Sequence, residues 1–192
     1  ALSSISRMTD PALVETVLEK AAHGSPEERR AAQSALTQMP GEEVEARIRT
    51  LASEKGVAEQ YELIRAMGAR YDKEALPVVK TFLESTDPEL RLEAVTALQN
   101  LGGYEELKIL VAELAGAENR RERETLKKSV FTLADNLQRK KAELLINYFS
   151  ECTSDENRVA FIQVMGRLAD PGSVPFLRGY LMQGSPEMQI ET

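Results

Sequence analysis

The positions of apolar residues repeat along the chain with a period of about 32 residues. The tetrapeptide Gly-Ser-Pro-Glu at 24–27 returns at 184–187, which is 160 residues later, and five units fill this interval. When residues 87–101 are shifted back by 62 positions onto residues 25–39, Pro, Glu, Arg, two Ala and Leu coincide. An internal repeat of this length predicts a stack of small, similar structural units.

Each unit opens with a segment that has the spacing of an amphipathic helix. Its three apolar columns lie three and one residues apart, and small residues dominate two of them. This spacing places the columns on one stripe of a helix, whereas a strand would need alternation, and small residues allow neighbouring helices to approach closely. The columns are Ala32, Leu63, Ala94, Ser129 and Phe161; Ala35, Ala66, Ala97, Thr132 and Val164; and Leu36, Met67, Leu98, Leu133 and Met165.

A second helix is predicted in every unit, beginning near residues 10, 41, 72, 103, 138 and 170. Pro77 and Pro175 share a column just inside this helix, where we expect a modest bend. No segment has the pattern of a strand. The sequence therefore predicts an all-α protein, a right-handed α-solenoid of stacked antiparallel helix pairs with about five units of ~32 residues and incomplete ends.

The predicted solenoid forms a single repeat domain over residues 1–192. Its units are 25–55, 56–86, 87–118, 119–152 and 153–184, with partial units at 1–24 and 185–192. A solenoid needs polar caps, because an uncapped last unit exposes its apolar face. We therefore expect a fragment of a longer protein, and open ends of this kind favour end-to-end self-association.

The repeated residues resemble HEAT repeats. The motif Asp-Pro-Glu-Leu-Arg at 87–91 is followed by Ala94 and by Ala-Leu at 97–98, and Ala-Leu-Pro stands at 75–77 in the neighbouring unit. The resemblance covers roughly residues 10–192, and the short unit is similar to the variant named after phycocyanobilin lyases, which is common in bacterial proteins. It implies a scaffold that binds other proteins and is only occasionally an enzyme. The arginine column of the family is replaced by Gln60 and Leu126 in two units.

Composition and charge narrow the possible functions. Hydrophobic residues make up 42% of the chain and charged residues 29%, as in a folded globular protein. The net charge of −7 argues against broad binding to nucleic acid or anionic membranes. No stretch approaches the about 20 apolar residues of a membrane-spanning helix. The expected partner is therefore a protein or peptide, including an acidic one, and the charge disfavours nucleic acid.

Catalytic and metal-binding patterns are nearly absent from the sequence. The chain has one histidine, His23, which we interpret as a helix cap or surface residue, and one cysteine, Cys152, which we interpret as a bystander thiol. Neither a phosphate-binding loop nor a paired nucleophile and base is present. We therefore expect no enzymatic activity, no metal site and no cofactor.

One region departs from the acidic character of the chain. Residues 120–141 contain eight basic and three acidic side chains, a local balance of +5 in a chain of −7. The last three cations stand at the N-terminus of a predicted helix, where the helix dipole disfavours positive charge. Positive charge at a helix N-terminus without a visible stabilising partner indicates that these residues were kept for a function. The basic residues are Arg120, Arg121, Arg123, Lys127, Lys128, Arg139, Lys140 and Lys141.

Two interpretations of this basic region remain open. It is either a solvated loop and helix in contact with acidic neighbouring repeats, or a patch that binds an acidic peptide, a phosphorylated partner or a nucleic-acid backbone. A second candidate surface is the solvent-facing column of the second helices, which contains Arg49, Lys80 and Arg178. The candidate partner-binding residues are Arg120, Arg121, Arg123, Arg139, Lys140, Lys141, Arg49, Lys80 and Arg178.

The leading hypothesis for function is a non-enzymatic scaffold for protein–protein interaction. The resemblance also implies two alternatives, a nucleic-acid-binding enzyme similar to HEAT-like DNA glycosylases and a protein similar to the bilin lyases. The charge of −7 and the absence of Trp disfavour the first alternative. No residue marks a bilin site, so the second depends on the repeat alone.

Overall fold

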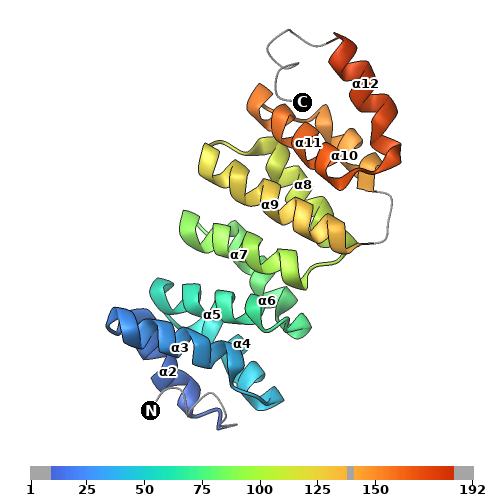
Figure 1. The fold of residues 1–192 in the computed structure, drawn as a ribbon. Coiled ribbons are helices and arrows are strands. Elements are labelled where there is room, and N and C mark those ends of the chain that lie inside the picture. Colours follow the sequence, from blue (N-terminus) through green and yellow to red (C-terminus); the bar gives the residue numbers. More distant parts are fainter. Residues whose placement is uncertain (1–9, 138–140, 184–192) are drawn as a thin grey trace. The chain divides into compact units, whose positions relative to one another are not determined.

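The computed structural model describes residues 10–137 and 141–183 (Figure 1). Every regular element in these ranges is a helix. The predicted all-α architecture of paired helices is therefore confirmed. The chain divides into two compact units, unit 1 (Ala1–Leu101) and unit 2 (Gly102–Thr192).

Unit 1 is a layered stack of helices in which first and second helices alternate along the chain. The first helices of successive repeats, α3, α5 and α7, pack side by side, and α2 and α4 pack against this row (Figure 1). Two short 3-10 helices flank α6. The elements are α2 (Leu13–His23), α3 (Pro26–Gln38), α4 (Glu42–Glu54), α5 (Val57–Ala69), η1 (Lys73–Ala75), α6 (Leu76–Thr81), η2 (Phe82–Glu84) and α7 (Pro88–Leu101).

Unit 2 repeats the same arrangement. The first helices α9 and α11 pack on each other, while α8 and α10 form the second row and η3 packs against α10. The core is aliphatic with an aromatic end, where the Phe149 ring meets the Phe161 and Phe176 rings edge-on at centroid distances of 6.3 and 5.0 Å. The elements are α8 (Tyr104–Gly116), α9 (Arg120–Asn136), α10 (Lys141–Phe149), α11 (Asp155–Leu168), η3 (Pro171–Ser173) and α12 (Val174–Gln183).

The bend predicted at the two prolines takes a different form in the structure. The chain runs through a 3-10 helix, η1 or η3, and starts the α-helix only afterwards, at Leu76 or Val174. Pro77 and Pro175 thus occupy the first turn of α6 and α12, where a missing N–H breaks no helical hydrogen bond. A later helix start is less costly than a proline in the helix interior, so the two prolines lie in the first helical turn and not deeper in the helix as predicted.

The small residues predicted at the contacts of the first helices do allow a close approach between α5 and α7. A Cβ atom added to Gly68 would lie 2.9 Å from both Cα and Cβ of Ala97. Ala66 and Ala94 are buried beside them, with exposed fractions of 3% and 0%. The stacking of consecutive repeats in unit 1 therefore depends on the absence of side-chain volume at this position.

We expect Gly68→Ala to reduce the free energy of unfolding by about 1–3 kcal/mol, because overpacking a filled interface displaces the backbone. Urea denaturation followed by circular dichroism measures the change. Gly166→Ala in α11 is the matched control, since a Cβ atom there would meet nothing within 4 Å. That control should stabilise the protein by up to about 1 kcal/mol, because Ala favours a helix over Gly. Equal effects of the two substitutions would contradict the close packing at Gly68.

Candidate functional site

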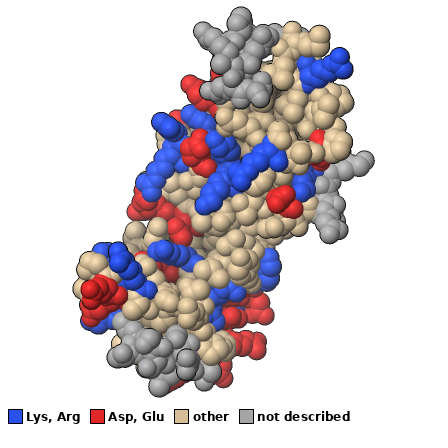
Figure 2. Space-filling model, in the orientation of Figure 1, with Lys and Arg blue, Asp and Glu red and all other residues tan. Residues whose placement is uncertain are grey.

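The outer side of α9 carries four of the eight cations of the predicted basic region. Asn119 caps this helix by accepting the backbone N–H of Glu122 at 3.0 Å, and Leu126, Val130 and Leu133 bury its opposite side. Figure 2 shows Lys and Arg side chains gathered over α9 and the adjacent part of α11. We call this surface the α9 basic face; its residues are Arg120, Arg121, Lys127 and Lys128 of α9 and Arg167 of α11.

Contacts between α9 and α11 hold two of these cations in place. The Lys127 ammonium forms an ion pair with Glu124 at 2.8 Å and donates to the side-chain oxygen of Gln163 at 3.0 Å. The guanidinium carbon of Arg167 lies 3.7 Å from the centre of the Phe131 ring, which is a cation–π geometry. Arg120, Arg121, Lys128 and Arg167 remain exposed to solvent.

Arg123 points toward the junction of three helices. It is half-buried, and its guanidinium donates to the side-chain oxygen of Asn157 at 3.3 Å. Asn157 is fully buried and donates in turn to the backbone carbonyls of Ala115 and Ala117 at 2.9 and 3.0 Å. Arg123 therefore supports the connection between α8, α9 and α11 and lies beside the α9 basic face rather than on it.

Lys141 at the start of α10 lies near a compensating negative charge that comes from a residue far along the sequence. The backbone N–H groups of Lys141 and Ala142 both donate to Oδ2 of Asp170 at 3.3 Å. Oδ1 of Asp170 accepts the N–H of Gly172 at 2.9 Å, so the same carboxylate caps η3. The carboxylate of Asp170, from the next repeat, thus offsets the unfavourable positive charge expected at the N-terminus of α10. Arg139 and Lys140 lie outside the described residues.

The three cations predicted on the second helices, Arg49, Lys80 and Arg178, differ in their exposure to solvent. Arg49 of α4 is only 16% exposed, and its guanidinium holds Asp72 at 2.7 Å and Glu74 at 2.8 Å. It thus joins α4 to the start of η1. Lys80 is half-buried on α6 in unit 1, and Arg178 is exposed on α12 in unit 2. Arg49 is therefore used in an internal contact between neighbouring repeats.

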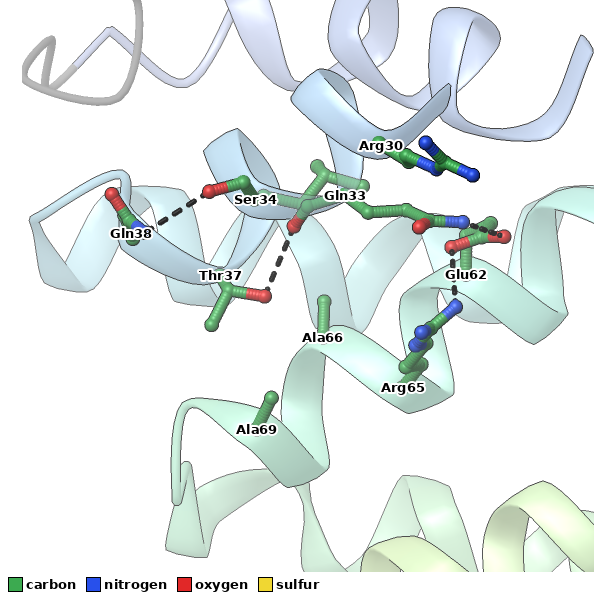
Figure 3. Close-up of a pocket in the computed structure, with 10 residues that line it drawn as sticks. Arg30, Gln33, Ser34, Thr37, Gln38, Glu62, Arg65, Ala66 and Ala69 are labelled. Atoms are coloured by element: carbon green, nitrogen blue, oxygen red, sulfur yellow. Dashed lines mark hydrogen bonds and ion pairs between the residues drawn. The ribbon is translucent and has the colours of Figure 1, made fainter. Parts of the chain in front are cut away.

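A polar groove of about 420 Å³ lies between α3 and α5 (Figure 3). Gln33 donates to the Glu62 carboxylate at 2.9 Å, and the Arg65 guanidinium lies 3.9 Å from the same carboxylate. On the α3 side, the Thr37 hydroxyl donates to the backbone carbonyl of Gln33 at 3.0 Å. The hydrogen bond from Gln33 to Glu62 crosses from α3 to α5 and links two repeats, whereas the other two contacts each lie within one helix.

The Cys152 thiol is poorly suited to chemistry. It is 5% exposed, and burial raises its pKa to about 11. At neutral pH the thiol is therefore protonated, which removes the nucleophilic form.

Comparison with known proteins gives a match to one family. Residues 44–129, from α4 into α9, match the model described as HEAT repeats. This match supports the assignment of the chain to a HEAT-repeat family. HEAT repeats generally act as scaffolds for protein interaction, and the matched segment includes four of the five residues of the α9 basic face. Neither the curated proteins nor the solved structures gave a match. In the described part of the chain, no helix has the length and apolar character needed to cross a membrane.

Sequence reasoning missed Arg167 and the Phe131 ring beneath it. The contacts between α9 and α11 join residues about one repeat apart, such as Lys127 and Gln163, which are separated by 36 positions. Arg167 follows Phe131 by the same interval. A search for cations one repeat beyond the basic region could have found this residue.

We expect Asp170→Ala to lower the free energy of unfolding at pH 7 by about 1–2 kcal/mol, the usual loss when an N-terminal cap is removed. Hydrogen bonds, first from Gly172 and then from Ala142 and Lys141, hold the pKa of Asp170 below its ordinary value of 3.8. A carboxyl with a lowered pKa contributes stability above its unfolded-state pKa and loses it as the pH falls through its folded-state pKa. The difference between variant and wild type should therefore shrink below pH 3.8.

Urea titrations at several pH values measure this difference. Asp135→Ala is the control, because Asp135 is an exposed carboxylate on α9. The role of Asp170 would be refuted by a difference that stays constant through the acid range.

Proposed function

We propose that this chain is a non-enzymatic protein-interaction module whose α9 basic face binds an acidic segment of a partner protein. The observation that carries the proposal is the concentration of exposed cations on one side of α9 in a chain with a net charge of −7. The family is typically non-enzymatic, and its general role as a scaffold supports the same reading.

The arrangement of the α9 basic face suits carboxylates. Guanidinium groups form paired hydrogen bonds with carboxylates, and lysines add charge with fewer geometric demands. Contacts to Gln163 and to the Phe131 ring hold Lys127 and Arg167 before a partner arrives. Side chains that are already ordered lose less conformational entropy on binding, which favours affinity.

An acidic protein segment fits this surface better than a nucleic-acid backbone. The negative charge of the whole chain repels a polyanion at long range, whereas a short acidic segment contacts only the local positive patch. Glu124 also stands within the face and pairs with Lys127. A closely spaced row of phosphates would have to lie against this carboxylate.

The test is the affinity for a fluorescein-labelled peptide rich in Glu and Leu, measured by fluorescence anisotropy at several salt concentrations. The double variant Arg120→Glu/Lys128→Glu should bind about tenfold or more weakly, because two attractive contacts become repulsive. The affinity of the wild type should fall as salt screens the charges.

A second double variant, Arg29→Glu/Arg30→Glu, is the matched control. Both of its arginines are exposed, and it changes the net charge by the same amount. It should bind the peptide within about twofold of the wild type. Equal losses in the two variants would show that net charge, not the α9 basic face, determines binding. If the chain bound a labelled DNA duplex more tightly than the peptide, and if this binding needed Arg120 and Lys128, the partner would be a nucleic acid and not a protein.

A further inference from the structure

Three potential metal ligands meet at one end of α2. One ligand atom each from Glu19, His23 and Glu59 lies within 4.8 Å of the other two. We propose that these residues form a surface site for a divalent transition-metal ion such as Zn²⁺. The proposal concerns unit 1 and does not depend on the function proposed for α9.

The fold brings these residues together from two helices. Glu19 and His23 are four residues apart in α2 and therefore lie on the same side of that helix. Glu59 is the third residue of α5, and α2 packs against α5. The contact is direct, because Nε2 of His23 lies 3.1 Å from Oε1 of Glu59. The three ligands thus converge although 36 residues separate the last two.

The distances are close to those of a metal site. Zn²⁺ binds imidazole nitrogen and carboxylate oxygen at about 2.0–2.2 Å, which places neighbouring ligand atoms of a tetrahedral ion about 3.4 Å apart. The pair formed by His23 and Glu59 already meets this spacing at 3.1 Å. Glu19 and His23 are exposed, so rotation of their side chains can close the remaining distance. The open side leaves a position for water.

The donor set selects the class of metal. Imidazole suits Zn²⁺, Cu²⁺ and Ni²⁺, whereas Mg²⁺ and Ca²⁺ prefer oxygen ligands alone. Two carboxylates balance the charge of a divalent ion, and the C-terminal end of α2 also attracts a cation through the helix dipole. The nearby lysines have carboxylates of their own: Lys20 lies 3.1 Å from Glu28, and Lys55 lies 3.5 Å from Glu15.

The chain offers little competition for such a metal. His23 is its one histidine, so any binding that needs an imidazole must occur here. Cys152, its one thiol, belongs to unit 2 and is held in the protonated form by burial. An ion bound at His23 would connect α2 directly to α5 and stabilise unit 1 by mass action.

Isothermal titration of the metal-free chain with ZnCl₂ tests the site, and the proton spectrum of the single imidazole gives a second readout. We expect saturable binding of one Zn²⁺ per chain, a shift of the imidazole signals, and no comparable response to MgCl₂. His23→Ala and Glu59→Gln should each weaken the binding about tenfold or more. Circular dichroism establishes that both variants keep the helical fold.

Glu27→Gln is the control, because this exposed carboxylate of α3 lies outside the cluster. It should bind Zn²⁺ as the wild type does. Zn²⁺ binding that persists unchanged in His23→Ala would overturn the proposal, as would the absence of saturation at millimolar ZnCl₂.

Discussion

The packing of each helix pair on the next is the interaction on which the rest of the structure depends, because a single pair cannot bury its apolar side alone. In unit 1 this packing includes a close approach at Gly68 and Ala97, where an added Cβ atom would not fit. In unit 2 the packing of first on second helices includes an aromatic contact, where the fully buried Phe161 meets Phe149. Close backbone approach thus fills the packing within unit 1, and an aromatic contact fills it within unit 2.

Polar contacts between repeats then fix how the pairs align. Arg70 is 5% exposed and donates to the carbonyls of Leu36 and Met39 at 2.9 and 2.6 Å, which satisfies the C-terminal end of α3. Asp72 and Asp170 both stand before a 3-10 helix and both reach the preceding repeat, one through Arg49 and the other through the start of α10. These contacts use charges internally, whereas most cations of the α9 basic face are directed to solvent.

The repeat period made the helices and their buried columns predictable, because burial on one side of a helix leaves a direct trace in the spacing of apolar residues. Ala32, Leu63 and Ala94 were predicted as one column, and all three are fully buried. The exposed cations Arg120 and Arg121 were also among the candidates.

The pairing of charged side chains could not be predicted, because it depends on contacts between repeats that the spacing of apolar residues does not determine. Lys141 looked uncompensated because its counter-charge, Asp170, lies 29 positions away. Arg49 looked available because its ion pair with Asp72 depends on the turn of η1. The meeting of His23 with Glu59 likewise requires α2 to pack on α5. Repeats indicate which elements adjoin, but side-chain conformation decides which charges pair.

The most direct test of an interaction surface on α9 is to map the binding of the acidic peptide on the ¹⁵N-labelled chain by NMR. We expect the amide signals that shift first to belong to residues 120–131 and to the neighbouring part of α11 around Gln163 and Arg167. Shifts concentrated on α4, α6 and α12, with α9 unchanged, would place the binding surface on the second helices and refute a binding role for the α9 basic face.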